Sequence, residues 1–232
     1  RSVILSSVGS KWPNYAQNFD RVLSRLRNVE KVLAGFYEKL PDLLDITALP
    51  EDMDSKLIWM RGFLENKGHL GLRDRQLKLF LNKIEKSETA VIELDGQILG
   101  HYRGTLYYEP LYSKFTSDIR VAKFPYHLDI GWGVLSLEEV AEKESQSFFC
   151  GGDVIIKFGS GNRKIKLGKT GPNKSVKNLL NEKLLQQWRR PNFPLICSQN
   201  ALLCLPDIGV NIAANSDFGP GIKCIKATIL DK

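Results

Sequence analysis

The sequence of 232 residues lacks what several large classes of protein require. No apolar run approaches the ~20 residues that a membrane-spanning helix needs. Its four cysteines form no Cys-x-x-Cys pair, and no histidine stands near them to complete a zinc site. We therefore expect buried free thiols rather than disulfides or a metal site, and a reducing cytoplasm as the compartment.

Catalytic motifs are scarce as well. The three histidines, His69, His101 and His127, stand far apart, and no serine lies in a Gly-x-Ser-x-Gly elbow. No Gly-Lys-Ser/Thr closes a P-loop, and the carboxylates of Glu138 and Glu139 are adjacent rather than convergent. The residues themselves predict a binding module without catalytic residues.

Positive charge, in contrast, is concentrated in one part of the chain. The window from Ile155 to Arg190 holds ten basic side chains and one acidic side chain, Glu182, whereas the whole chain carries +7. Such a concentration is typical of a surface that binds a polyanion. The ten cations are Lys157, Arg163, Lys164, Lys166, Lys169, Lys174, Lys177, Lys183, Arg189 and Arg190.

Glycines frame the centre of this window. Gly159–Gly161 and Gly168–Gly171 stand on either side of Asn162–Leu167. Glycine lets backbone amides approach an anion closely, and the helix that we expect next adds its positive N-terminal end, with Asn173 or Thr170 as N-cap. The pattern favours phosphate contacts along a folded nucleic acid, and the alternative is an ordinary solvated helix face.

Apolar periodicity in the first half predicts three helices. The first spans about 15–40, between Pro13 and Pro41, and is expected to pack on a small bundle. The others span about 54–66, with Gly68 as its stop, and about 73–86. Their apolar stripes are Phe19, Val22, Leu26, Val29, Leu33, Phe36 and Leu40; Leu57, Met60 and Leu64; and Leu77, Phe80, Leu81 and Ile84.

The remainder of the chain predicts strands and one further helix. Asp95-Gly96 predicts a hairpin between 90–94 and 97–99, continued by an aromatic-rich strand over 101–108. Lys174, Lys177 and Asn181 are expected on one face of a helix over about 173–187. Further strands are expected over 119–121, 127–130, 133–137, 154–158, 194–197, 201–205 and 222–230.

These elements together predict an α+β protein. Residues 1–110 are expected to form a helical bundle with a β-hairpin appendage. Residues 111–152 are expected to supply a connector and the first strands of a second unit. Residues 153–232 are expected to form a small mixed α/β domain that carries the basic window.

The motifs of the second half resemble those of a known family. In the C-terminal domain of bacterial tRNA(Ile)-lysidine synthetase, Lys-x-Leu-Lys-Lys, Glu, Trp, Arg and Pro-Leu-Leu recur at this spacing. The matching segments here are Lys157-Phe158, Lys174–Leu179, Glu182, Trp188, Arg190 and Pro194–Ile196. The first half is similar to the same family at Trp12-Pro13, Arg61–Leu64, Arg73–Leu77, Asp95-Gly96, Tyr102-Arg103 and Leu106–Tyr108.

The resemblance implies an enzyme that uses ATP and Mg²⁺ to adenylate C2 of the wobble cytidine of a CAU anticodon. Lysine then displaces AMP, and codon reading changes from AUG to AUA. The family's ATP site is a Ser-Gly-Gly-x-Asp-Ser loop on an N-terminal domain, and this sequence has no such motif. Because the chain begins at Arg1 without methionine or a secretory leader, we expect a fragment or processed chain that holds tRNA(Ile) for its own N-terminal catalytic domain. A homodimer is left open.

By matching position, the resemblance implies tRNA contacts at Lys157, Arg163, Lys174, Lys177 and Arg190, and at Arg61 and Arg73 in the first half. Charge alone adds Lys164, Lys166 and Lys169. Trp188 fills a family position where a core role and base stacking are equally open. The alternative function is a protein-interaction adaptor, in which the first helix docks a partner and the cations meet an acidic surface.

Overall fold

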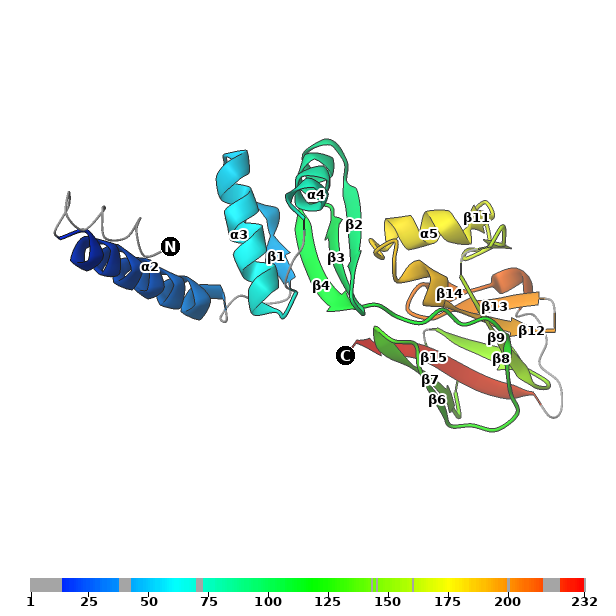
Figure 1. Cartoon of the computed structure of the whole chain (residues 1–232). Coiled ribbons are helices and arrows are strands. Elements are labelled where there is room, and N and C mark those ends of the chain that lie inside the picture. The colour runs from blue at the N-terminus through cyan, green and yellow to red at the C-terminus, as the bar shows by residue number, and fades with distance from the viewer. Residues whose placement is uncertain are drawn as a thin grey trace. The chain divides into compact units, whose positions relative to one another are not determined.

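The computed structural model describes residues 14–37, 43–69, 73–142, 144, 146–159, 161–199, 201–214 and 222–231. The chain divides into two compact units, Arg1–Leu111 and Tyr112–Lys232 (Figure 1). Both units combine helices with antiparallel sheets, which confirms the prediction of an α+β protein.

The first unit contains three α-helices and a four-stranded antiparallel sheet among its described residues, with strand order β1-β4-β3-β2. A 3-10 turn, η1 (Ile46–Ala48), follows the first strand. The elements are α2 (Tyr15–Tyr37), β1 (Leu43–Asp45), α3 (Met53–Asn66), α4 (Asp74–Lys86), β2 (Thr89–Leu94), β3 (Gln97–Tyr102) and β4 (Thr105–Pro110).

The core of the first unit lies between α3, α4 and the sheet. The predicted stripes of both helices are buried, and they share one apolar cluster with Leu99 and Leu106 of the sheet. Gly68, with φ +89°, follows the end of α3 as expected. Because the sheet supplies a large part of this core, the expected helical bundle with a hairpin appendage is not confirmed.

The long helix α2 is confirmed, but its expected packing is not. Phe19 is 62% exposed and Leu26 55%, so most of its apolar stripe faces outward. Burial begins only near the end of the helix, where Tyr37 meets Trp59 edge-to-face at 6.2 Å between ring centroids. Pro13, Leu40 and Pro41, which were expected to bound or extend the helix, lie outside the described residues.

The hairpin at Asp95-Gly96 is confirmed, since Leu94 pairs with Gln97 across the turn. The single strand expected over 101–108 is wrong. Arg103 and Gly104 both have positive φ (48° and 85°) and form a second two-residue turn, across which Tyr102 pairs with Thr105. Two consecutive residues with positive φ are the geometry of a tight hairpin, and glycine is the only sequence signal for it here.

Among its described residues, the second unit contains two larger antiparallel sheets and one small one. Their strand orders are β14-β13-β12-β9-β5, β6-β7-β15-β8 and β10-β11. The elements are β5 (Ile119–Val121), β6 (Tyr126–Asp129), β7 (Gly133–Glu139), β8 (Ser147–Cys150), β9 (Val154–Phe158), β10 (Lys164–Ile165), β11 (Lys174–Ser175), α5 (Val176–Glu182), η2 (Arg190–Asn192), β12 (Pro194–Ser198), β13 (Ala201–Leu205), β14 (Gly209–Val210), η3 (Ile212–Ala214) and β15 (Lys223–Asp231).

Both larger sheets and α5 contribute to a single core in this unit. Phe148 and Ile225 from one sheet, Ile156 and Leu195 from the other, and Leu180 of α5 are all fully or almost fully buried. The last strand, β15, runs beside β7 and β8 rather than beside β13 (Figure 1). Strands that precede residue 153 therefore contribute to both sheets.

The four cysteines are buried and free, as predicted for Cys197 and Cys204 on the neighbouring strands β12 and β13. Burial raises the pKa of the Cys204 thiol to about 12. In the part of the chain that the structure describes, no helix has the length and apolar character needed to cross a membrane.

Candidate nucleic-acid interface

Helix α5, in the middle of the basic window, spans Val176–Glu182 and is much shorter than the 173–187 predicted. Its predicted first turn is instead strand β11, which pairs with β10, so that Lys174 faces Ile165 across the ladder. The predicted N-caps were wrong, because the hydroxyl of Ser175 accepts the bond from the Asn178 amide at 3.2 Å. Leu184, with φ 57°, lies just beyond the end of the helix.

The two faces of α5 separate packing from solvent, although Leu184, which was expected on the packed face, is exposed beyond the end of the helix. Val176, Leu179 and Leu180 are buried in the core, whereas Lys177 and Asn178 are exposed. Lys174 lies on β11 and not on the helix, so it does not share the helical face with Lys177. The two lysines are nevertheless close in the chain, with only the capping residue and Val176 between them.

The loop between β10 and β11 is anchored at its base by Asn211. The Asn211 side-chain carbonyl accepts the Lys166 amide at 3.3 Å, and its amide group donates to the Leu202 carbonyl at 2.7 Å. The Ile212 amide also donates to the Lys166 carbonyl at 2.9 Å. These bonds fix the start of the loop to the five-stranded sheet. Lys169, further along the loop, is exposed.

Only the first of the two predicted glycine brackets requires glycine for its backbone angles. Gly159 and Gly161 have φ of +85° and +44°, in the left-handed region. Ser160 between them lies outside the described residues. At Gly171, in contrast, an added Cβ would meet no heavy atom within 4 Å and φ is not in the left-handed region, so neither packing nor backbone angle requires glycine there.

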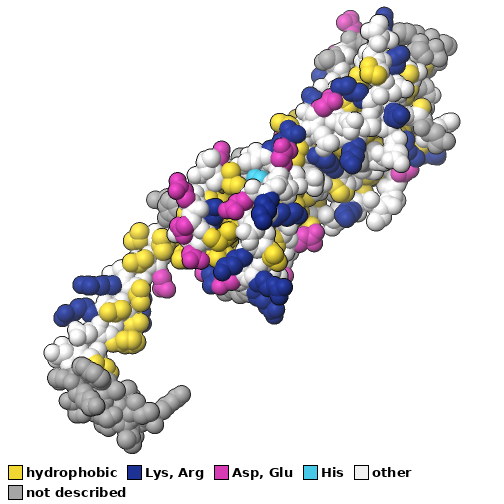
Figure 2. All heavy atoms as spheres, turned by 90° about the horizontal axis from the view of Figure 1, so that it is seen from above, with side chains coloured by type: hydrophobic (Ala, Val, Ile, Leu, Met, Phe, Trp, Pro, Cys, Tyr) yellow, Lys and Arg dark blue, Asp and Glu magenta, His cyan; other side chains and the backbone are white. Residues whose placement is uncertain are grey.

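Three of the predicted cations are exposed and form no ion pair with any other residue that the structure describes. These are Lys164 on β10, Lys169 in the loop and Lys177 on α5, which we call the hairpin–helix lysines. Lys183, directly after α5, is exposed too, although the resemblance does not imply a contact there. Figure 2 shows Lys and Arg outnumbering Asp and Glu on the visible face of the second unit.

Three others have partners inside the protein. The Lys157 ammonium lies 3.1 Å from the Asp118 carboxylate, and its side chain is only 21% exposed. The Lys174 ammonium donates to both Glu182 carboxylate oxygens, at 2.8 and 3.0 Å. The Arg190 guanidinium donates from Nε and Nη2 to the Leu185 carbonyl, at 2.9 and 2.7 Å. Nothing in the sequence pointed to Asp118, because it lies on a distant segment.

The remaining predicted residues of this unit are half-buried. Arg163 places Nη1 3.6 Å from the Cys197 sulfur. Burial raises the pKa of that thiol, while the charges of Arg163 and Lys157 oppose the rise. Lys166 and Trp188 are half-buried as well. The structure thus leaves the hairpin–helix lysines as the most accessible part of the predicted site.

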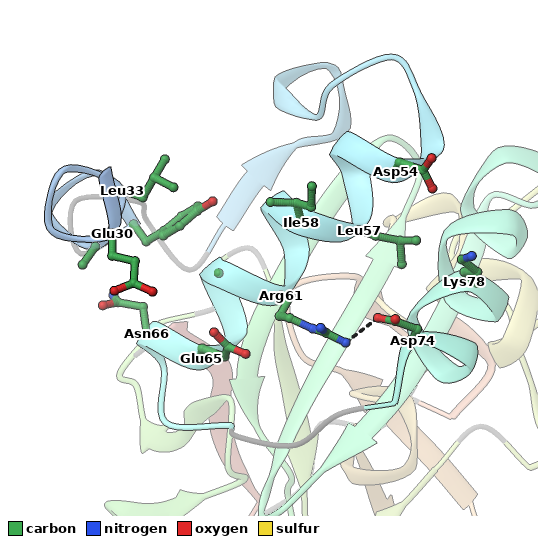
Figure 3. Close-up of a pocket in the computed structure, with 13 residues that line it drawn as sticks. Glu30, Leu33, Asp54, Leu57, Ile58, Arg61, Glu65, Asn66, Asp74 and Lys78 are labelled. Carbon is green, nitrogen blue, oxygen red and sulfur yellow. Dashed lines mark hydrogen bonds and ion pairs between the residues drawn. The ribbon is translucent and has the colours of Figure 1, made fainter. Parts of the chain in front are cut away.

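In the first unit, the Arg61 guanidinium is bonded to the Asp74 carboxylate at a cleft between α2, α3 and α4 (Figure 3). Arg73, just before α4, is exposed. The cleft has a volume of about 620 Å³. Its charged lining residues are four acids and two bases: Glu30, Asp54, Glu65, Asp74, Arg61 and Lys78.

The histidines do not converge on a site. The His69 ring is bonded to the Tyr108 hydroxyl at 2.6 Å, His101 is buried in the first unit, and His127 lies on β6 of the second. Among the described residues, no group of three or more His, Cys, Asp or Glu is placed to hold a metal ion.

Comparison with known proteins adds a family match to this geometry. Residues 154–223 match the family model described as "TilS substrate C-terminal domain". A solved structure, "Crystal structure of TILS C-terminal domain", is similar over 50% of this chain and 98% of that chain, with 13% identity and a TM-score of 0.39. No curated protein matches this chain significantly. The matched segment contains the hairpin–helix lysines, α5, and strands β9 to β14.

Proposed function

We propose that this chain, in which residues 154–223 form a TilS substrate C-terminal domain, is the tRNA-holding part of a tRNA(Ile)-lysidine synthetase. In this role the chain binds tRNA(Ile) with a CAU anticodon. It presents the wobble cytidine to a catalytic domain that uses ATP and Mg²⁺ to attach lysine at C2. Because this sequence has no Ser-Gly-Gly-x-Asp-Ser loop, we assign no catalytic step to it.

The observation that carries the proposal is the exposure of the hairpin–helix lysines inside the matched segment. A lysine that has no carboxylate partner can give its whole charge to a phosphate. Contacts of this kind orient a folded RNA without reading much sequence, because the A-form major groove is too narrow for side chains. The role that follows is positioning of the RNA.

The ion pairs and hydrogen bonds within the protein determine which cations we rank first as phosphate contacts. Lys164, Lys169 and Lys177 are the leading phosphate contacts, followed by Lys174, whose exposed partner Glu182 can be displaced. The less accessible cations, which are half-buried or bonded within the protein, are Lys157, Arg163, Lys166 and Arg190. They stabilise the surface and add to its positive charge. Arg61 and Arg73 remain proposed contacts of the first unit.

A gel-shift titration with tRNA at several salt concentrations tests this function. If about five cations meet phosphates, the association constant should fall by roughly three to five log units per log unit of salt. The double variant K174E/K177E should weaken binding to many tRNAs alike. A salt-independent affinity, or a loss confined to one tRNA, would contradict a positioning role.

One observation favours the second candidate, a protein-interaction adaptor. The apolar stripe of α2 is exposed, with Phe19, Val22, Leu26 and Val29 each more than half accessible. Exposed apolar patches of this kind mark interaction sites. An adaptor should purify with little absorbance from bound nucleic acid and show no affinity for tRNA. An enzyme would instead show ATP–pyrophosphate exchange, and we expect none from this chain.

A further inference from the structure

Glu182 is the single acidic residue among the ten cations of the basic window. It is the last residue of α5, and both of its carboxylate oxygens accept bonds from the Lys174 ammonium, at 2.8 and 3.0 Å. The pair is open to solvent, because the Lys174 side chain is 46% exposed and that of Glu182 53%.

Helix stability does not account for an acid at this position. The C-terminal end of a helix carries partial negative charge, so a carboxylate there is mildly unfavourable. An ion pair this exposed also contributes little to folding, since water and salt screen it and two long side chains lose freedom. What the pair does achieve is to neutralise one cation of the candidate interface while no RNA is present.

We propose that Glu182 is an internal competitor for RNA phosphate. In the unbound protein its carboxylate occupies the Lys174 ammonium as a phosphate oxygen would, and RNA binding must displace it. Glu182 therefore lowers the affinity of the surface for every polyanion, which limits retention of RNAs that make only this contact. The inference rests on the proposed function of the same surface.

The test is a tRNA gel-shift salt titration of E182Q beside the wild-type chain. Lys174 meets phosphate in both proteins, but the Lys174–Glu182 pair that competes in the wild type weakens as salt rises. E182Q should therefore show a steeper log–log salt slope than the wild type, by at most about 0.7–0.9, the value of one cation. The affinity at low salt should rise about two- to fivefold, the range expected for an exposed pair. A role confined to folding would move neither the slope nor the affinity in this direction.

The second unit supplies a matched control. The Glu139 carboxylate lies 2.8 Å from the Lys223 ammonium, with side chains 48% and 49% exposed, outside the basic window. E139Q removes the same charge from an equivalent pair and should leave slope and affinity unchanged. E182D, which keeps the charge, should return both toward their wild-type values.

A double variant shows whether Glu182 acts through Lys174. In a K174Q background, E182Q should lose most of its effect on the slope, because the competed cation is gone. A steep wild-type slope with an unchanged or weaker E182Q would overturn this inference alone. An equal gain in E139Q, or a full E182Q effect without Lys174, would overturn it as well. A flat wild-type slope would instead overturn the proposed function, and this inference with it.

Discussion

The cleft of the first unit and the hairpin–helix surface of the second both contain basic residues that sequence analysis assigned to tRNA. In the cleft, Arg61 is bonded to Asp74, and acids outnumber bases among the lining residues. On the hairpin–helix surface, Lys164, Lys169 and Lys177 are exposed without an ion pair among the described residues. The difference teaches that internal partners, and not the number of cations in a segment, decide how much positive charge a ligand meets.

Helices α2 and α5 differ in how far their apolar faces are buried. Both are amphipathic, but α5 buries its apolar face completely, whereas Val22 and Val29 of α2 are more than half exposed. The hairpin–helix lysines thus lie on and beside the helix whose apolar face is buried. We therefore expect RNA binding to depend on the fold of the second unit more than on that of the first.

The largest expected effect follows from removing a buried side chain from the core of one unit or the other. Leu180→Ala on α5 removes a fully buried side chain below the basic surface and should lower the free energy of unfolding by about 2–5 kcal/mol. Leu81→Ala on α4 should cost a similar amount in the first unit. Urea denaturation followed by gel shift should show that L180A loses tRNA affinity at lower urea than L81A. The reverse order would place the main RNA contact in the first unit.

Removing the exposed charge should have the next largest effect. The triple variant K164Q/K169Q/K177Q loses three phosphate contacts, so its tRNA affinity in 0.1 M salt should fall roughly a hundredfold and its salt slope by about two. The matched triple variant R75Q/K83Q/K86Q removes three exposed cations from α4. Its affinity should stay within about threefold of wild type. Equal losses of tRNA affinity in both triple variants would show that binding depends on net charge and not on the hairpin–helix surface.

A pH effect should appear at the β3–β4 turn of the first unit and not at β12 and β13 of the second. His101 is buried, its Nε2 accepts the Gly104 amide at 3.1 Å, and burial lowers its pKa below the ordinary value. The neutral ring therefore stabilises the β3–β4 turn fully above about pH 6.5, and this stability is lost as the pH falls below the unfolded pKa. Amide exchange, corrected for its intrinsic pH dependence, should show weaker protection of Gly104 at pH 5.5 than at pH 7.5. H101Q should abolish this difference, and the amides of β12 and β13 should show none.

The smallest effect is expected at the cleft. Arg61→Gln breaks an ion pair whose side chains are 43% and 62% exposed, so the free energy of unfolding should change by less than about 1 kcal/mol. Because Asp74 already neutralises Arg61, tRNA affinity should change by less than about twofold in the same gel shift. A loss of tenfold or more would show that Arg61 leaves Asp74 to bind RNA.

The elements that depend on local pattern were predictable from the sequence. The burial of Leu57, Met60 and Leu64 follows from their spacing on one helical face, and the Asp95-Gly96 turn follows from the angles that glycine permits. The concentration of charge between Ile155 and Arg190 likewise pointed to the segment that the family model matches. Local pattern was sufficient wherever no distant segment competed.

The features that the sequence did not predict depend on contacts between residues far apart in the chain. The predicted start of α5 failed because Lys174 and Ser175 pair with β10, and no local signal favours that pairing over a helix. Asp118 and Asn211 could not be identified as partners of Lys157 and Lys166 for the same reason. The apolar period of α2 correctly indicated a helix, but a period does not specify whether its apolar stripe is covered.

Lysine footprinting compares both units most directly. The chain is acetylated with and without tRNA, and the protection of each lysine is read by mass spectrometry. We predict strong protection of Lys164, Lys169 and Lys177, and little protection of Lys78, Lys83 and Lys86 on α4, with the contrast fading at high salt. Equal protection in the two groups, or stronger protection on α4, would contradict a tRNA-holding role for the hairpin–helix surface.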